Sequence, residues 1–413
     1  MSFNQPGSMF AVSNGEGYGA YGTCPFGVTY ASASGPMKVV ELLFVASVVI
    51  LVGSGEEKHA SPRRVVVFNT KRGTKAKELV FGSPVVGVRI NRRRLVVAEA
   101  ERISVYDMDN KLKLITRIEV GSSAGDLGLL SLTPSPDPDD GCYLAYPKAQ
   151  VGDVATCVVL VDALNLADHI LIQAHKSASV AALAFSYDGS MLASASEHGT
   201  VIRVFGIPSC DPLYEFRRGT STATIYSLAF DPHNDFLAAS SSSGTIGVYK
   251  LAAPEVSVVD TMFSYLPAAV SSAWDPQRRF ASITGDPDVV SIVSFGALTP
   301  TEADMYTENT IVLQVITKSA WFRRYLIDTR LGGEARLLEQ FYLPDQGSFP
   351  DLAKGFASVS ASGPTSASAS SSATATASSA STPSTATATA SASASASASS
   401  SSTPATATTS TST

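Results

Sequence analysis

The sequence predicts an all-β chain built as a β-propeller and followed by a disordered tail, and three observations carry this prediction. The first is an internal repeat: Leu183-Ala184-Phe185 recurs as Leu228-Ala229-Phe230, and Gly199-Thr200-Val201 recurs as Gly244-Thr245-Ile246. The second is the lack of any long helix-periodic segment, and the third is an uncharged stretch that begins at Gly355. The repeat offset of about 45 residues matches one blade of a WD-repeat propeller.

Each repeat is expected to form four short strands separated by polar turns. In the first repeat, the apolar run Val180–Ser186 is followed by Met191–Ser196 and by the β-branched run Thr200–Phe205. The turns between them are rich in Gly, Asp and Ser. Weaker copies of this pattern lie upstream, at Val85–Ile90, Arg94–Ala98, Ile103–Tyr106, Met37–Val52 and Arg64–Asn69. One short helix is expected around Thr301–Tyr306.

The distribution of charge predicts where the propeller ends. Residues 1–354 contain all 30 Lys and Arg and all 36 Asp and Glu, and residues 355–413 contain none of them. About 45 residues per blade gives between seven and eight blades for the first region, and we expect seven in one closed ring. The second region is dominated by Ser, Ala and Thr, which bury too little apolar surface to offset chain entropy. We therefore expect residues 355–413 to be a low-complexity disordered tail.

The composition excludes several classes of protein. A net charge of −6 and a pI near 5.5 argue against a generally basic nucleic-acid binder. The four cysteines form no C-x-x-C pair and are expected to be reduced thiols in a cytosolic protein. The apolar stretch Val39–Val52 contains Glu41 and is shorter than the roughly 20 residues that span a bilayer. The N-terminus lacks the pattern of a signal peptide, so the chain is expected to be soluble or to meet a membrane from outside.

No enzyme is predicted, although two motifs resemble catalytic or cofactor sites. Gly17–Gly22 fits G-x-G-x-x-G, but no helix follows to receive a dinucleotide phosphate. Gly121–Gly125 fits G-x-S-x-G and makes Ser123 the nucleophile of a rival serine hydrolase, yet a Pro-rich loop follows where a helix is needed. The histidines lack the spacing of a metal site, so neither a metal nor a cofactor is expected.

The functional prediction depends on two adjacent arginines, Arg217 and Arg218, between the two clearest repeats. In an extended segment successive side chains point to opposite faces, so the two guanidinium groups must serve different sites. Each has a planar fork of donors suited to phosphate oxygens. Hydroxyl-rich segments flank both sides: His175, Ser194, Ser196, Thr200 and Arg203 on one side, and Thr222, Thr224, Ser240, Ser241, Ser242 and Thr245 on the other. This pattern predicts two anion sites beside one Arg-Arg pair.

The segment Phe216-Arg217-Arg218-Gly219 in this setting resembles the PROPPIN family, the phosphoinositide-binding propellers of autophagy. The resemblance extends over most of the region before the tail, and its early segments are most similar to the autophagy-related protein 18 branch. Those segments are Glu41–Phe44, Leu51–Gly55, Ser61–Arg64 with Asn69–Arg72, and Asn91–Leu95.

The resemblance implies a non-enzymatic effector that binds phosphatidylinositol 3-phosphate and phosphatidylinositol 3,5-bisphosphate at two rim sites. The headgroup-binding residues that it implies are His175, Ser194, Gly199, Thr200, Arg203 and Arg217 for the first site, and Arg218, Gly219, Ser241 and Thr245 for the second. Where the family usually has His in the second site, this chain has Gly247, which predicts an altered affinity or headgroup preference.

The resemblance also implies how the chain reaches a membrane and a partner. A loop of the sixth blade would insert Met262, Phe263, Tyr265 and Leu266 into the bilayer, which is favourable for exposed apolar tips. Pro62 and Arg63 would contact an autophagy-related protein 2-like lipid-transfer protein. The expected location is cytoplasmic, with peripheral association with preautophagosomal, endosomal or vacuolar membranes. The alternative is a WD-repeat scaffold that binds peptides and no lipid.

Overall fold

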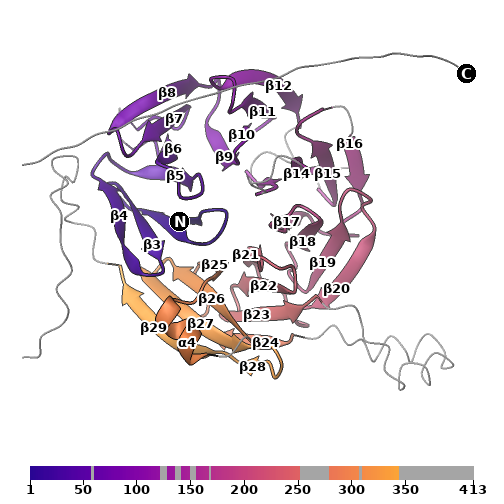
Figure 1. Cartoon of the computed structure of the whole chain (residues 1–413). Helices are drawn as coiled ribbons and strands as arrows, with labels where there is room; N and C mark the ends of the chain where they lie inside the picture. The colour runs from indigo at the N-terminus through magenta and orange to yellow at the C-terminus, as the bar shows by residue number, and fades with distance from the viewer. Residues whose placement is uncertain are drawn as a thin grey trace, which may run out of the picture. The chain divides into compact units, whose positions relative to one another are not determined.

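The computed structural model describes residues 1–56, 60–120, 128–134, 141–148, 155–166, 169–251, 279–306 and 309–343. The chain separates into two compact units, Met1–Phe356 and Ala357–Thr413, and all described residues belong to the first. This unit is a seven-bladed β-propeller, as the repeat predicted, with seven sheets that follow one another around a ring (Figure 1). The N-terminus lies toward the centre of the ring.

Each blade is a four-stranded antiparallel meander, and successive blades follow chain order. The first blade contains β1 (Ser2–Phe3), β2 (Met9–Ser13), β3 (Tyr18–Thr23) and β4 (Phe26–Ser32). The second contains β5 (Met37–Leu42), β6 (Val48–Gly53), β7 (Arg64–Asn69) and β8 (Thr74–Val80). The third contains β9 (Val85–Ile90), β10 (Arg94–Glu99), β11 (Arg102–Asp107) and β12 (Lys113–Glu119). The fourth and fifth contain β13 (Ser131–Leu132), β14 (Tyr143–Lys148), β15 (Cys157–Asp162) and β16 (His169–Ile172); and β17 (Val180–Phe185), β18 (Met191–Ser196), β19 (Val201–Gly206) and β20 (Pro212–Arg217).

The sixth blade contains β21 (Ile225–Phe230), β22 (Phe236–Ser241), β23 (Thr245–Lys250) and β24 (Ala281–Thr284). The seventh contains β25 (Ser291–Gly296), β26 (Thr310–Thr317), β27 (Trp321–Asp328) and β29 (Arg336–Tyr342). A short additional strand, β28 (Gly333–Glu334), leaves the seventh blade and pairs in parallel with β24. This pairing ties the sixth blade to the seventh through the backbone.

The structure confirms the strands predicted from local patterns. Val180–Ser186 and Met191–Ser196 correspond to β17 and β18, and the upstream run Val85–Ile90 is β9. The apolar stretch Met37–Val52 is divided into β5 and β6 by a turn in which Phe44 has a positive φ of 48°. The short helix is also present as α4 (Pro300–Met305), and it begins with a capping box between Thr299 and Glu302.

The apolar core lies between the blades, because each strand alternates its side chains between the two neighbouring sheets. One face of the fifth blade packs Ile202, Val204 and Phe216 against Leu237 and Tyr249 of the sixth. The opposite face packs another set of apolar side chains against the fourth blade. Burial of each large apolar side chain stabilises the fold by about 1.5–3 kcal/mol, so every blade is held mainly by its neighbours.

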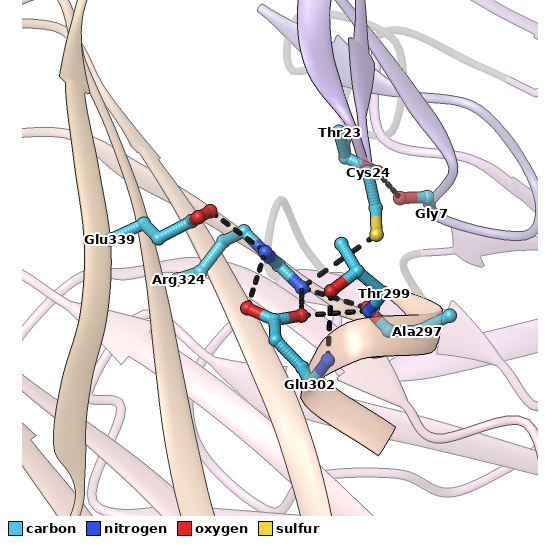
Figure 2. A network of polar contacts seen from close by, with 8 residues as sticks. All are labelled: Gly7, Thr23, Cys24, Ala297, Thr299, Glu302, Arg324 and Glu339. Carbon is cyan, nitrogen blue, oxygen red and sulfur yellow. Dashed lines mark hydrogen bonds and ion pairs between the residues drawn. The ribbon is translucent and has the colours of Figure 1, made fainter. Parts of the chain in front are cut away.

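The ring closes between the first and seventh blades through side chains. Phe26 stacks on Phe341 with ring centroids 4.1 Å apart, and Phe10 lies 4.8 Å from Phe322. Beside this cluster, Arg324 is only 1% exposed and reaches Glu302, Glu339 and the carbonyl of Ala297 (Figure 2). Its Nη2 also lies 3.8 Å from Cys24 Sγ in the first blade. In the described residues the two blades share no strand, so these contacts complete the ring.

Of the described residues, no helical segment is long and apolar enough to traverse a membrane. The segment Gly17–Gly22, which fits a dinucleotide-binding motif by its spacing, lies largely within strand β3. A dinucleotide site needs a helix N-terminus after its last glycine, and here the chain continues through a turn into β4. The segment is therefore part of the first blade.

Candidate functional site

The end of strand β20 places Arg217 and Arg218 on opposite sides of the fifth blade. Phe216 anchors this segment in the core, where its ring lies 5.7 Å from that of Tyr214 and 5.0 Å from that of Tyr249. Arg217 pairs with Val201 of β19, whose neighbour on the same face, Arg203, contacts the fourth blade. The Arg218 side chain instead extends to the sixth blade. The opposed placement predicted from strand alternation is therefore present.

The predicted first anion site brings His175, Ser194 and Arg203 into contact, with Arg217 on the same face of the fifth blade. Arg203 Nη1 donates to the carbonyl of Ala174 at 2.9 Å and lies 3.1 Å from His175 Nδ1. The other imidazole nitrogen, Nε2, lies 3.2 Å from Ser194 Oγ. A guanidinium only donates, so Nδ1 must accept, and Nε2 must carry the proton that it donates to Ser194. Arg203, His175 and Ser194 thus form a chain of donors that ends at a serine hydroxyl, and Arg217 lies outside this chain.

The imidazole of His175 is neutral in this arrangement. The side chain is 4% exposed, and burial together with the nearby Arg203 lowers its pKa to about 4. Both causes act against a second proton, because burial disfavours the charged form and Arg203 is a like charge. At neutral pH the first site therefore gains its positive charge from the arginines alone.

The two arginines of the first site differ in their partners. Arg203 Nε donates to Glu215 at 2.8 Å, so a carboxylate already competes for this guanidinium. Arg217 is exposed, and no residue in the described part of the chain accepts a hydrogen bond from its side chain. An incoming anion would therefore meet one guanidinium that has no competitor and one that it must share with Glu215.

Gly199 fixes the turn between the two sites. It has a positive φ of 57°, and a Cβ at this position would lie 1.9 Å from the carbonyl oxygen of Ala223 in the next blade. The Gly199 carbonyl accepts from Arg218 Nε, and the Arg218 N–H donates to the carbonyl of Thr200 at 2.9 Å. Any other residue here would be strained and would push the two blades apart. The glycine therefore holds Arg218 in place.

The predicted second anion site brings together Arg218, Ser241 and Ser243, and the Thr245 carbonyl accepts from Ser241 Oγ at 3.3 Å. Arg218 Nη1 donates to Ser243 Oγ at 3.2 Å, and Ser243 Oγ lies 2.9 Å from Ser241 Oγ. Arg218 Nη2 donates to the carbonyl of Ser221. Burial lowers the pKa of Arg218, Tyr249 opposes this shift, and the like charge of Arg279 adds to it. All three acceptors of the guanidinium are neutral, so a phosphate can replace them with a stronger interaction.

Several residues around these predicted sites were not expected from the sequence. Ser243 and Arg279 were not predicted, and Glu215 was not recognised as a competitor. The sequence pattern groups Ser240 with the second site, but its hydroxyl points the other way and donates to the carbonyl of Ser291 in the seventh blade. Alternation along β22 distinguishes Ser240 from Ser241, but only after the strand bounds are known.

The remaining predicted residues have simpler surroundings. Gly219 follows β20, and a Cβ there would meet nothing within 4 Å. Pro62 and Arg63 form the turn before β7 in the second blade, where Arg63 is exposed and the Pro62 carbonyl accepts from Val85 N at 2.8 Å. The predicted insertion residues Met262, Phe263, Tyr265 and Leu266 lie outside the described residues, and so does Ser123.

One cavity of the propeller is a weaker candidate site. It measures about 350 Å³ and is lined by the innermost strands, with Glu41 and Arg89 among its polar groups. These two already form an ion pair of 2.7 Å. Burial raises the pKa of Glu41, and Arg89 opposes this rise. A site whose charges are mutually paired attracts an anion less than the rim arginines do.

Comparisons with known proteins show the family and agree with the fold. The PROPPIN family model matches residues 1–282. Autophagy-related protein 18 of Yarrowia lipolytica is 33% identical over 84% of this chain and 96% of its own length, and that of Dictyostelium discoideum is 34% identical over 83% and 92%. Among solved structures, Atg21 in complex with the coiled-coil of Atg16 matches with a TM-score of 0.66 at 24% identity, covering 83% of this chain and 98% of its own. Hsv2 of Kluyveromyces marxianus matches with a TM-score of 0.62 at 18% identity, covering 83% and 97%.

Proposed function

Because the chain belongs to the PROPPIN family of autophagy β-propellers, we propose that it is a non-enzymatic effector that binds phosphoinositides at both anion sites. The ligands are phosphatidylinositol 3-phosphate and phosphatidylinositol 3,5-bisphosphate. One observation carries the proposal: Arg217 and Arg218 leave one strand end toward different neighbouring blades, and hydroxyl groups accompany each of them. Two guanidinium groups so placed take two separate headgroups from the same membrane.

The first site supports a phosphate monoester through two kinds of donor. Arg217 offers a planar fork, and hydrogen bonds between a guanidinium and phosphate are about twice as strong as those between neutral groups. His175 Nε2 holds Ser194 Oγ as an acceptor, which leaves the serine proton to donate to the ligand. A neutral imidazole supplies this orientation without a second cation in the buried part of the site.

Membrane association is proposed to combine headgroup binding with insertion of Met262, Phe263, Tyr265 and Leu266. The described ends of that segment support the proposal: β23 ends at Lys250 and β24 begins at Ala281, so the segment leaves the sixth blade, to which the second site belongs. A few apolar residues in the interface add to a modest headgroup affinity. We expect peripheral association with preautophagosomal, endosomal or vacuolar membranes.

Protein partners are proposed to bind other blades. The turn that carries Pro62 and Arg63 is fixed by backbone hydrogen bonds, and the Arg63 side chain is exposed, so it is suited to contact an autophagy-related protein 2-like lipid-transfer protein. The structure of Atg21 with the coiled-coil of Atg16 is a precedent for a protein partner on a related propeller. Loss of a partner after Arg63→Ala, with vesicle binding unchanged, would separate the two activities.

Vesicle flotation tests the lipid proposal. Vesicles of phosphatidylcholine with phosphatidylinositol 3-phosphate should carry the wild-type chain to the top of a gradient, and the Arg217→Thr/Arg218→Thr double variant should stay at the bottom. The matched control is Arg102→Thr/Arg117→Thr, which removes the same charge from exposed strands of the third blade. Equal flotation of the two double variants would contradict the proposal and favour a scaffold that binds peptides and no lipid.

A further inference from the structure

Tyr249 has a hydroxyl group that the fold buries without satisfying. The side chain is 0% exposed, and its ring packs against Phe216 with centroids 5.0 Å apart. Within the described residues, no group forms a hydrogen bond with Tyr249 Oη. A buried polar group without a partner costs about 1–3 kcal/mol, so its retention needs an explanation other than stability. A phenylalanine would fill the same space without this cost.

The hydroxyl is directed along β23 toward the second anion site. Thr245, Gly247 and Tyr249 alternate onto one face of this strand, the face turned toward the fifth blade. A Cβ on Gly247 would lie only 2.9 Å from Tyr249 Oη and 3.1 Å from the ring carbon that carries it. The phenol therefore lies over Gly247 and points toward Thr245. Any side chain at position 247 would displace it.

The electrostatic surroundings keep the Tyr249 hydroxyl protonated, so it can donate a hydrogen bond beside two cations. Burial raises the pKa of Tyr249 to about 12, and Arg279 and Arg218 oppose the rise. The group is therefore protonated at neutral pH. The guanidinium groups of Arg279 and Arg218 lie near enough to influence the pKa of Tyr249. A ligand attracted by both of these cations would be an anion.

We infer that Tyr249 Oη is the inner hydrogen-bond donor of the second anion site and binds a phosphate oxygen of the headgroup held by Arg218. The inference rests on the proposed function and names a residue that determines the affinity of its second site. The phosphate reaches Oη as Arg218 exchanges its neutral acceptors for the anion. Gly247 is then required because it leaves room for the phenol. The chain thus has an aromatic hydroxyl donor where the resemblance implied only an altered site.

The test isolates the second site by using Arg217→Thr as the background. In surface plasmon resonance on vesicles with phosphatidylinositol 3-phosphate, Tyr249→Phe in this background should weaken binding about fivefold to tenfold, as loss of one hydrogen bond to an anion predicts. The matched control is Tyr214→Phe in the same background, which removes a neighbouring hydroxyl that donates to the carbonyl of Leu251 at 2.7 Å. The control should bind as the background does.

Thermal unfolding without lipid separates ligand binding from a structural role. Tyr249→Phe should unfold at the same temperature as the wild type or higher, whereas Tyr214→Phe should unfold lower because it loses a satisfied hydrogen bond. Equal affinities of the background and its Tyr249→Phe derivative, while Arg218→Thr abolishes binding, would overturn the inference and leave the proposed function intact. If the wild-type chain shows no binding to these vesicles, the proposed function and the inference both fail.

Discussion

The molecule contains two kinds of arginine environment, and their difference supports the proposed location of the anion sites. Arg324, at the closure between the first and seventh blades, has both Glu302 and Glu339 as partners and is almost completely buried. Burial alone would lower its pKa, but the hydrogen bonds of the two carboxylates outweigh burial and raise it. At the rim, burial lowers the pKa of Arg218, and its acceptors are neutral, so no carboxylate offsets this effect.

This difference separates an arginine that holds the fold from arginines that are available to a ligand. The positive charge of Arg324 is compensated within the chain, so an external anion would gain little by approaching it. The charges of Arg217 and Arg218 have no carboxylate partner among the described residues. Residue type alone does not distinguish these two kinds of arginine. The position of the carboxylates does.

The largest expected effect comes from breaking the compensated site. Arg324→Ala should lower the free energy of unfolding by about 3–5 kcal/mol, since it leaves two partly buried carboxylates and a cavity at the ring closure. Vesicle binding by the fraction that remains folded should be unchanged. Urea denaturation followed by tryptophan fluorescence measures the first quantity. A control variant, Arg102→Ala, breaks an exposed pair with Glu119 and should change the free energy of unfolding far less. Similar losses for both variants would show that the closure does not depend on Arg324.

The next effect comes from removing an uncompensated arginine. Arg217→Thr should leave the free energy of unfolding within about 0.5 kcal/mol of wild type, because it is an exposed side chain with no partner to lose. It should weaken binding to phosphatidylinositol 3-phosphate vesicles about tenfold or more, as loss of a charge-assisted contact predicts. Arg117→Thr is the control for charge. Stability loss without an effect on binding would place Arg217 with the structural arginines.

A fall in pH tests the comparison further, because Arg203 contacts the neutral imidazole of His175. The pKa of His175 is lowered to about 4 in the folded chain by burial and by Arg203, whereas an unfolded histidine titrates near 6.5. The stabilisation is therefore complete above pH of about 6.5 and is lost as the pH falls through 4, by about 3 kcal/mol in all. Comparison of wild type with His175→Gln over this range isolates the contribution, since other acid-sensitive groups are common to both. Parallel pH profiles would contradict the neutral assignment.

The fold was predictable from sequence to the extent that its signals are local. Alternating apolar runs and Gly-containing turns located β9, β17 and β18, and the repeat gave the number of blades. The opposed directions of Arg217 and Arg218 also followed from strand geometry alone. The contacts within the sites did not, because they depend on strand register. The pairing of Arg203 with Glu215 precedes an irregularity between Val204 and Phe205, which a sequence pattern does not reveal.

The second site was harder to predict because its parts are distant in sequence or identical in type. Arg279 acts on Arg218 from the far end of the segment between β23 and β24. Four consecutive serines, Ser240–Ser243, offer equivalent hydroxyls, and only the bounds of β22 determine which of them face Arg218. The Tyr249 hydroxyl was not identified for another reason. A tyrosine in a buried strand predicts a core residue, and only the structure shows that its oxygen lacks a partner.

The smallest expected effect tests whether a carboxylate at the rim limits binding as the carboxylates around Arg324 do. Glu215 occupies Arg203 at 2.8 Å and is more than half exposed. Glu215→Gln removes this competitor and one negative charge from the first site, so affinity for phosphatidylinositol 3-phosphate vesicles should rise about twofold to fivefold, with stability changed by less than about 1 kcal/mol. Glu119→Gln, which breaks the exposed pair with Arg102, is the matched control and should leave affinity unchanged. An increase that is equal in both variants would assign the gain to net charge. Weaker binding by Glu215→Gln would show that Glu215 orients Arg203 for the ligand, so that partial compensation at the rim serves recognition and full compensation at Arg324 serves only the fold.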